Sequence, residues 1–291
     1  MERPLIIAEI GCNHRGEPET ARKMVRIAAL ECGVDVVKFQ KRNPKECLTP
    51  AQYAAPHPVP ANAYGATYGE HREALELDLS EHRRLKELCE ECGVVYSTSV
   101  WDMTSAREIA SLGPQMIKVP SACNTHFEMI RYLCDAFGGE LHISLGMTTR
   151  AEEESLISLL EKRERLRDTV LYACVSGYPV DYEDLHLLEV DRLLGEYGGH
   201  CKGIGYSGHH LGIAVDIAAM TLGARWIERH FTLDRTWKGT DHAASLEPDE
   251  MRRLVRDIHN VAKALQRKKT DLLPVEIPQR EKLKQFRLLY G

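Results

Sequence analysis

The feature that most constrains the fold of this chain is a regular alternation of short apolar, β-branched runs with amphipathic helical stretches. Eight runs predict strands, at Leu5–Ala8, Val34–Phe39, Val94–Ser97, Met116–Val119, Leu141–Ser144, Thr169–Tyr172, Gly203–Tyr206 and Arg225–Glu228. Eight helical patterns follow them in turn, at Thr20–Cys32, Glu81–Glu91, Thr104–Ser111, His126–Phe137, Thr149–Lys162, Leu185–Glu196, Leu211–Leu222 and Met251–Leu265. This alternation over 291 residues predicts an α/β protein with a (β/α)8 TIM barrel, and a doubly wound open sheet is the alternative.

The segments outside this repeat have a different composition. Residues 41–79 are rich in Pro, Ala and Tyr, and we expect them to form an irregular loop over one end of the barrel. Residues 1–265 would then make the (β/α)8 barrel domain, and residues 266–291 a charged, partly apolar C-terminal extension.

The overall charge and the cysteine content argue against several classes of protein. The net charge is −5 and the isoelectric point about 6.2, so we expect neither nucleic acid nor a membrane surface as a partner. No apolar run approaches the length of a membrane span, and the N-terminal residues have no signal-peptide pattern. Nine cysteines, an odd number, predict a reduced, cytoplasmic chain. The single Cys89-Glu-Glu-Cys92 motif lies in a helical pattern, which favours core packing over zinc binding.

Polar residues occur at or just after the carboxyl ends of the predicted strands. In chain order they are Glu9, Lys38, Gln40, Ser97, Thr98, Lys118, Ser121, Ser144, Ser176, Tyr178, Ser207, His209, Glu228 and His230. In a (β/α)8 barrel these ends meet at one mouth, where barrel enzymes carry their active sites. Lys38 and Lys118 lie inside apolar runs, where a lysine is costly to bury unless it is paired. The alternative for each is an edge lysine that keeps its ammonium in water.

This ring of residues predicts a site for a small dianion beside a divalent metal. The two lysines and the nearby hydroxyls suit a phosphate ester or a phosphoenol carboxylate. His209 and His230 would hold a metal ion with open positions that polarises a carbonyl, although each could instead cap its strand with a hydrogen bond. Glu9 or Glu228 could move a proton or activate water. Together these groups favour attack of an anionic carbon nucleophile on a metal-activated aldehyde.

One stretch mimics a cofactor motif. Gly203-Ile-Gly205-Tyr-Ser-Gly208 matches the glycine pattern of dinucleotide-binding folds, with Glu228 twenty residues further on. The first glycine lies inside a predicted strand, however, and only one further strand follows the next helix. Because the dinucleotide motif normally opens a series of βα units, we do not expect a Rossmann site.

Taken together, the motifs resemble the sialic acid synthase (N-acetylneuraminate synthase) family of phosphoenolpyruvate-dependent sugar-condensing enzymes. The matching stretches are Ala8-Glu-Ile-Gly-Cys-Asn-His14, Val36-Val-Lys-Phe-Gln40, Ser97-Thr98, Ile117-Lys-Val-Pro-Ser121, Ser144-Leu-Gly-Met147, Tyr178-Pro179, Gly205-Tyr-Ser207 with His209, Glu228-Arg-His-Phe-Thr-Leu-Asp234, and Asp241-His242. They cover the whole predicted barrel.

The resemblance implies an enzyme that joins phosphoenolpyruvate to the open-chain aldehyde of an aldose such as N-acetylmannosamine. The products would be a 3-deoxy-2-keto sugar acid of the nonulosonic type and phosphate. It implies Mn2+ or Mg2+ on His209 and His230, and a homodimer. Phosphoenolpyruvate positions correspond to Lys38, Thr98, Lys118, Ser121 and Ser207, sugar positions to Gln40, Tyr178, Glu228 and Asp241, and further substrate positions to Ser144 and Ser176. Glu9 matches a carboxylate that handles a proton or water, and Glu9, Lys38, Lys118 and Glu228 form the predicted catalytic set.

The sequence departs from the family pattern in three places. Gly208 replaces the usual Asp, and Ser121-Ala-Cys replaces Ser-Gly-Glu. We also expect the family's C-terminal antifreeze-like domain to be missing, which bears on the identity of the sugar. Candidates for sugar selection in the 41–79 loop are Tyr64, Tyr68, Glu70, His71 and Arg72.

Two other functions stay open at this point. The first is a metal-independent Schiff-base aldolase or lyase that uses Lys118 or Lys38 as the nucleophilic amine. The second is a non-catalytic barrel that binds a sugar phosphate.

Overall fold

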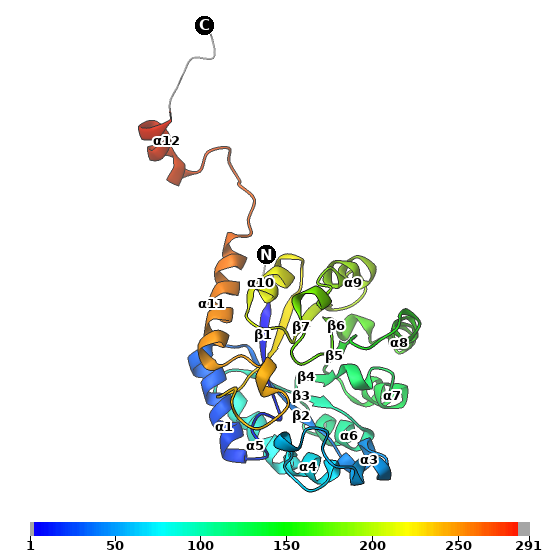
Figure 1. Ribbon diagram of the computed structural model, residues 1–291. Helices are drawn as coiled ribbons and strands as arrows, with labels where there is room; N and C mark the ends of the chain where they lie inside the picture. Colours follow the sequence, from blue (N-terminus) through cyan, green and yellow to red (C-terminus); the bar gives the residue numbers. More distant parts are fainter. Residues whose placement is uncertain (1–2, 285–291) are drawn as a thin grey trace.

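The computed structural model describes residues 3–284 and folds into a closed barrel of parallel strands (Figure 1). The strands are β1 (Leu5–Gly11), β2 (Val36–Lys41), β3 (Val95–Val100), β4 (Met116–Val119), β5 (Glu140–Ser144), β6 (Thr169–Cys174), β7 (Gly203–Gly208) and β8 (Trp226–His230). Each strand pairs with its successor, and β8 pairs with β1. The predicted (β/α)8 barrel is therefore confirmed, and the doubly wound sheet is excluded.

An outer ring of helices covers the barrel. They are α1 (Pro18–Arg26), α5 (Leu79–Glu91), α6 (Met103–Ser111), α7 (Phe127–Ala136), α8 (Arg150–Lys162), α9 (Glu189–Tyr197), α10 (Ala214–Thr221) and α11 (Pro248–Ala264). The helix predicted at Thr20–Cys32 is α1 followed by a π-helical turn, Ile27–Cys32. Gly33 ends this turn in a left-handed conformation, which costs glycine little because it has no Cβ. None of the helices in residues 3–284 is long and apolar enough to cross a membrane.

The interior of the barrel is built in two layers with opposite chemistry. The layer at the amino ends of the strands is apolar and consists of Ile7, Val36, Met116, Val170, Tyr172 and Trp226. Two residues further along four of these strands lie the buried charged side chains Glu9, Lys38, Lys118 and Glu228. Side chains alternate across a strand, so residues two apart face the same side. The charged residues therefore lie above a sealed apolar floor.

Several strands extend beyond the last apolar residue of the predicted run. β1 continues to Gly11, β3 to Val100, β7 to Gly208 and β8 to His230. His230, expected after its strand, is the last residue of β8.

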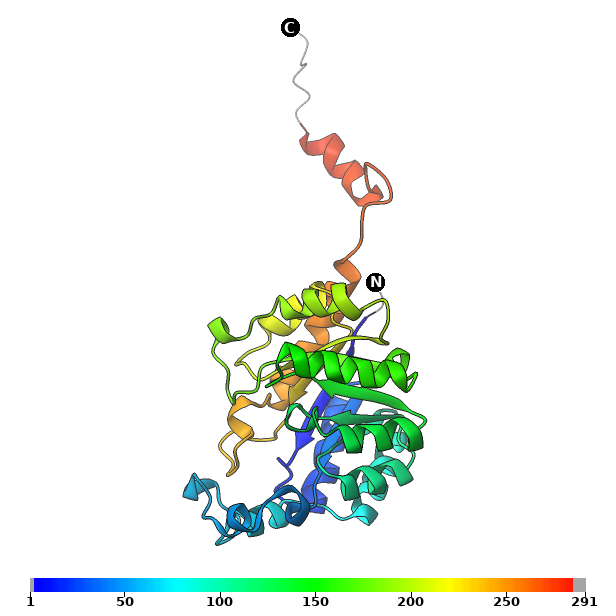
Figure 2. The ribbon, with the colours of Figure 1, turned by 90° about the vertical axis from the view of Figure 1, so that its right-hand side faces the viewer.

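The segment 41–79 is ordered, and the expectation of an irregular loop is wrong. It contains α2 (Pro44–Cys47), α3 (Pro50–Ala54) and α4 (Tyr68–Ala74). Capping boxes begin two of these helices, with Thr49 and Gln52 at α3 and with Thr67 and Glu70 at α4. Figure 2 shows the segment at the same end of the barrel as the loop after β8. The two are joined where the Tyr64 hydroxyl donates to the Lys238 carbonyl over 2.6 Å.

The C-terminal residues leave the barrel after α11. The chain runs through a short 3-10 turn, Pro274–Glu276, to α12 (Ile277–Leu283). Figures 1 and 2 both show α12 away from the barrel. The predicted extension from residue 266 thus begins close to the end of α11, and its last residues, 285–291, lie outside the described part.

Candidate active site

The strand ends enclose an inner pocket of about 230 Å3 at the mouth of the barrel. Its lining residues are Glu9, Lys38, Gln40, Ser99, Trp101, Lys118, Pro120, Ser121, Ala122, Ser144, Met147, Cys174, Ser176, Tyr178, Ser207, His209, Glu228 and His230. All of the predicted site residues except Ser97, Thr98 and Asp241 are in this set. The fold thus gathers residues that are up to 221 positions apart in the sequence.

The bottom of the inner pocket, directly above the apolar floor of the barrel, is a row of alternating charges. Lys38 Nζ lies 2.6 Å from Glu9 Oε2 and 3.6 Å from Glu228 Oε1, and Lys118 Nζ lies 3.0 Å from Glu228 Oε2. These four side chains are at most 8% exposed. Both lysines are therefore buried and paired, and the alternative of lysines at the edge is excluded.

The two lysines have opposite pKa shifts. Burial lowers the pKa of Lys38, but the carboxylates of Glu228 and Glu9 outweigh it and raise the pKa overall. Burial dominates at Lys118 and lowers its pKa, because Lys38 opposes its charge while Glu228 supports it. The Lys118 ammonium also lies 3.4 Å from the centre of the Tyr172 ring, a cation–π contact with the floor.

The two carboxylates differ as well. Burial acts to raise the pKa of Glu228, but Lys118 and Lys38 outweigh it and hold the pKa below its usual range. Burial raises the pKa of Glu9 to about 7, although Lys38 acts against it. Gln40 Nε2 donates to Glu9 Oε1 over 2.9 Å and orients the carboxyl group. Glu9 can thus gain or lose a proton near neutral pH, as a general acid–base group must.

Thr98 lies outside the pocket, contrary to its predicted role. Its hydroxyl donates to the Tyr96 hydroxyl over 2.5 Å, in the layer between barrel and helices. Ser99 takes the place in the pocket and accepts a hydrogen bond of 2.8 Å from Lys38 Nζ. The strand register explains the error, because Lys38 pairs with Ser97 and Gln40 with Ser99, so these residues share the inner face. Strict alternation from Lys38 could have found Ser99.

Serine hydroxyls surround the charged row. Ser207 Oγ donates to Glu228 Oε1 over 3.1 Å. Ser121 and Ser176 approach each other across Gly146, where a Cβ would lie 2.6 Å from Ser176 Oγ and 2.7 Å from Ser121 Oγ. The sequence analysis did not single out Gly146, and its lack of a side chain keeps this part of the pocket open.

The two predicted metal ligands lie side by side. The rings of His209 and His230 have centroids 5.4 Å apart, and the Tyr178 ring lies 4.4 Å from that of His209. A hydrogen bond of 3.0 Å between His209 Nδ1 and the Val175 carbonyl assigns the proton to Nδ1 and leaves Nε2 as a lone-pair donor. His230 Nδ1 is buried without a hydrogen-bond partner in the described residues.

This histidine pair fits a divalent cation with open coordination positions. Residues 3–284 contain no group of three or more His, Cys, Asp or Glu that could hold a metal. The protein would therefore supply two nitrogen ligands and leave the other positions to substrate or water. Burial lowers the pKa of His230 to about 4, which keeps it neutral. Burial acts to lower the pKa of His209, but Cys174 and the Val175 carbonyl outweigh it and raise the pKa overall. A proton would therefore compete with a metal ion for this histidine.

Asp241 lies at the rim, outside the inner pocket. It precedes a 3-10 turn, His242–Ala244, and its carboxylate interacts electrostatically with His230. Burial acts to raise its pKa, but His230 and Thr240 outweigh it and lower the pKa. Its place near the histidine pair remains compatible with contact to a substrate.

Two motifs that resembled other functions have structural roles. Gly203, Gly205 and Gly208 lie within β7, and a Cβ at Gly205 would lie 2.5 Å from the Tyr172 ring. A Cβ at Gly208 would lie 2.8 Å from the Tyr206 ring and 2.9 Å from that of His210, so the residue that replaces the family Asp has no room for a side chain. Cys89 and Cys92 pack on the core from α5, and all nine cysteines are unpaired.

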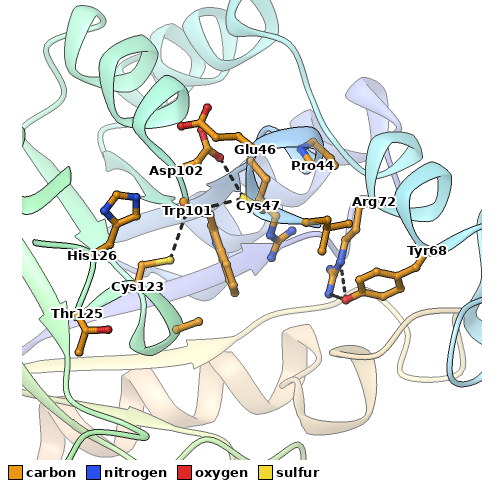
Figure 3. Close-up of a pocket in the computed structure, with 13 residues that line it drawn as sticks. Pro44, Glu46, Cys47, Tyr68, Arg72, Trp101, Asp102, Cys123, Thr125 and His126 are labelled. Atoms are coloured by element: carbon orange, nitrogen blue, oxygen red, sulfur yellow. Dashed lines mark hydrogen bonds between the residues drawn. The ribbon is translucent and has the colours of Figure 1, made fainter. Parts of the chain in front are cut away.

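An outer chamber of about 420 Å3 adjoins the inner pocket and shares Trp101 and Ala122 with it (Figure 3). Its lining residues are Arg42, Pro44, Glu46, Cys47, Leu48, Tyr68, Arg72, Trp101, Asp102, Ala122, Cys123, Thr125 and His126. Two of the candidates from segment 41–79, Tyr68 and Arg72, are among them. Glu70 instead caps α4, and His71 packs against Tyr64 at a centroid distance of 5.9 Å.

Known proteins share this architecture and sequence. The NeuB family model matches residues 24–270. The chain belongs to the NeuB family. It is 36% identical to the N-acetylneuraminate-9-phosphate synthase of Homo sapiens over 280 residues, which are 96% of this chain and 76% of that protein. It is 33% identical to the N,N'-diacetyllegionaminic acid synthase of Campylobacter jejuni over 266 residues, 91% of this chain and 78% of that protein.

A solved structure supports the same assignment. The N-acetylneuraminic acid (sialic acid) synthetase from Leptospira borgpetersenii, in complex with citrate, superposes with a TM-score of 0.80 at 27% identity. The match covers 97% of this chain and 93% of that one. The resemblance to sialic acid synthases and the assignment as a synthase-type enzyme are thereby confirmed for this NeuB family member.

Proposed function

We propose that this NeuB family chain condenses phosphoenolpyruvate with the open-chain aldehyde of an aldose. The products are a 3-deoxy-2-keto sugar acid and phosphate. The observation that carries the proposal is the combination, in one buried pocket, of the Glu9–Lys38–Glu228–Lys118 row with the histidine pair. A site for a dianion therefore adjoins a site for a cation that would activate the aldehyde.

Phosphoenolpyruvate binds to the charged row and to the surrounding hydroxyls. Lys38 and Lys118 neutralise its carboxylate and phosphate, with charge-assisted hydrogen bonds that are roughly twice as strong as neutral ones. Hydroxyl donors to the substrate are Ser99, Ser121, Ser144, Ser176 and Ser207. The Glu228 carboxylate forms an ion pair of 3.0 Å with the Lys118 ammonium and so holds it inside the pocket.

The sugar aldehyde binds between the row and the histidines. His209 and His230 would hold a Mn2+ or Mg2+ ion, which would supply Lewis-acid polarisation of the carbonyl. C3 of the enol forms a bond to the aldehyde carbon, water adds at C2, and the bond from C2 to the phosphate oxygen breaks. Glu9, with its pKa of about 7, takes the proton from this water or returns one to the sugar oxygen. Gln40, Tyr178 and Asp241 position the sugar.

The substrate is an N-acylated aldose of the N-acetylmannosamine type. The relatives support this proposal, because their names are those of synthases of N-acetylneuraminate 9-phosphate and of diacetyllegionaminic acid. We also propose that the protein acts as a cytoplasmic homodimer, for which light scattering on the purified protein tests the oligomeric state.

The deciding experiment measures phosphate release from phosphoenolpyruvate with Mn2+ and a panel of aldoses, each repeated with EDTA. The panel contains N-acetylmannosamine, its 6-phosphate, mannose, arabinose and N-acylated dideoxyhexoses. Release that depends on one aldose and disappears with EDTA is the expected result. Release that survives EDTA would contradict the metal role of the histidines.

The Schiff-base alternative has one observation in its favour, the lowered pKa of Lys118. It predicts that borohydride traps a keto sugar acid on the protein in the presence of EDTA, and that Lys118→Arg abolishes trapping. A barrel that only binds sugar phosphates would bind the substrates and release no phosphate in either assay.

A further inference from the structure

The outer chamber adjoins the inner pocket, and the condensation itself does not use it. At about 230 Å3 the inner pocket is smaller than the roughly 300–1,000 Å3 of sites that enclose small-molecule ligands. Two substrates must be present together, so one of them has to extend beyond it. The outer chamber of about 420 Å3 lies next to it, with Trp101 and Ala122 lining both, and offers the required space.

Two arginines line this chamber, and the first is held in place by the protein. Arg42 is 6% exposed, its guanidinium lies 4.2 Å from the centre of the Trp101 ring, and it forms an ion pair of 3.3 Å with Glu76. It also donates to the side chains of Gln40 and Cys12. Arg42 thus supplies a fixed positive charge with few donors to spare.

The second arginine has a different set of contacts. Arg72, on α4, donates from Nε over 3.0 Å and from Nη2 over 2.6 Å to one acceptor, the Tyr68 hydroxyl. It forms no ion pair with a carboxylate in residues 3–284, and its Nη1 makes no hydrogen bond there. Figure 3 shows Arg72 and Tyr68 on the opposite side of the chamber from His126 and Cys123. A half-buried guanidinium with unused donors is a ready partner for an anion.

The acidic residues of the chamber are already engaged. Glu46 accepts a hydrogen bond of 3.0 Å from the Met103 amide. Asp102 caps α6 and accepts from the Ser105 amide over 2.7 Å and from the Asn43 amide over 2.7 Å. These bonds hold both carboxylates against the backbone, and neither forms an ion pair with Arg72 in residues 3–284.

The chamber is also electrostatically connected to the predicted sugar site. The carboxylate of Asp241 interacts electrostatically with His230 and also with the guanidinium groups of Arg42 and Arg72. A ligand that reaches from the histidine pair into the chamber would therefore pass close to Arg72.

We propose that the outer chamber binds the end of the aldose farthest from its aldehyde, and that Arg72 binds an anionic group at that end. Arg42 adds a second positive charge to the chamber, and a phosphate ester is the class of anionic group that fits it. This inference rests on the proposed condensation. It makes Arg72 the residue that selects a phosphorylated aldose over a neutral one.

The kinetic test compares an N-acetylated aldohexose with its 6-phosphate as co-substrate of phosphoenolpyruvate. The unmodified enzyme should have the higher kcat/KM for the 6-phosphate. Arg72→Gln should lower that value about 10- to 100-fold, as the loss of hydrogen bonds to a charged group does, and should change the value for the neutral sugar less than about two-fold. The matched control is Arg83→Gln, which removes an exposed arginine from α5 and should change neither value.

A preference of the unmodified enzyme for the neutral sugar would overturn the inference. So would an equal loss for both sugars in Arg72→Gln, because it would indicate a general effect on segment 41–79 with its short helices α2, α3 and α4, here called the lid.

A binding measurement separates this inference from the condensation itself. Calorimetry with the alditol 6-phosphate, in which the aldehyde is reduced and cannot react, should give binding that the neutral alditol lacks and that Arg72→Gln weakens. If phosphate release fails with every aldose while this binding remains, the condensation is wrong and the anion site stands. If the alditol 6-phosphate binds no better than the alditol, the anion site is wrong whatever the reaction.

Discussion

The inner pocket and the outer chamber lie side by side but are built in different ways. The charged groups of the inner pocket come from the barrel strands. Each is fixed by an ion pair with a neighbour in the same layer, as Lys38 is by Glu9 and Glu228. The outer chamber is closed by short helices of segment 41–79, and of its two arginines Arg72 donates hydrogen bonds, within residues 3–284, to Tyr68 alone. Groups that react need fixed positions, whereas groups that select a substrate can vary on loops of a rigid scaffold. We therefore expect the strand residues to carry out the chemistry and the short helices of segment 41–79 to select the substrate.

The largest effect should follow from breaking the charged row. Lys38→Met removes the cation between Glu9 and Glu228, so it should abolish detectable phosphate release and cost about 3–5 kcal/mol of stability, as expected when one partner of a buried ion pair is lost. Activity assays and urea denaturation measure the two effects. Lys45→Met, at an exposed lysine of the lid, is the control. If Lys38→Met retained more than about a tenth of the activity, the row would not be the catalytic centre.

Replacing the proton-handling carboxyl should have the next largest effect. Glu9→Gln should lower kcat by about 100- to 10,000-fold, the usual contribution of a general acid–base group. The limb of the pH–rate profile near 7, which we assign to Glu9, should disappear with it. Glu154→Gln, at an exposed carboxylate on α8, should leave the profile unchanged.

The same variant also tests the pKa of Glu9 through the pH dependence of the free energy of unfolding. The folded-state pKa of Glu9, about 7, is raised above its ordinary value of 4.5, so folding favours the protonated form. Its contribution to the free energy of unfolding is fully present below about pH 4.5 and is lost as the pH rises through about 7. Glu9→Gln stays neutral and should not show this loss. Denaturation at pH 5 and pH 8 measures it, and an equal pH dependence in both proteins would contradict the assignment.

Removal of the histidine pair should affect metal dependence as well as rate. His209→Ala should reduce activity by at least about 100-fold and abolish the increase in melting temperature that we expect Mn2+ to give the unmodified protein. His186→Ala, at a position away from both pockets, should preserve both. A Mn2+-induced increase that persisted in His209→Ala would place the metal elsewhere.

The smallest effects should separate the two faces of β3. Ser99→Ala removes a partner of Lys38 and should lower kcat/KM for phosphoenolpyruvate about 10-fold. Thr98→Val removes the bond to Tyr96 behind the barrel and should leave kcat/KM within about two-fold while costing about 1 kcal/mol of stability. Steady-state kinetics and denaturation of both variants decide the matter. The reverse pattern would show that Thr98 contacts the substrate after all.

Much of the site could be predicted from the sequence because a barrel converts position along each strand into position in space. The eight apolar runs gave the strand order, and polar residues at their ends gave the contents of the mouth. The lysines inside two of these runs were informative because their burial requires partners. Thr98 was predicted in place of Ser99 because the sequence shows where the apolar run ends but not which of its side chains face the inside of the barrel. The pairing of Lys38 with Ser97 and of Gln40 with Ser99 shows that Ser99 faces inward.

The barrel, the strands that build it and most side chains of the inner pocket could be predicted from local periodicity alone. The pairing within the charged row, the opposite pKa shifts of Glu9 and Glu228, and the second chamber beside segment 41–79 became visible only in the folded protein. These depend on burial and on distances between residues far apart in the chain. Arg72 illustrates the difference: its sequence context of α4 gives a helix, and only the fold leaves its guanidinium facing a cavity beside the catalytic residues.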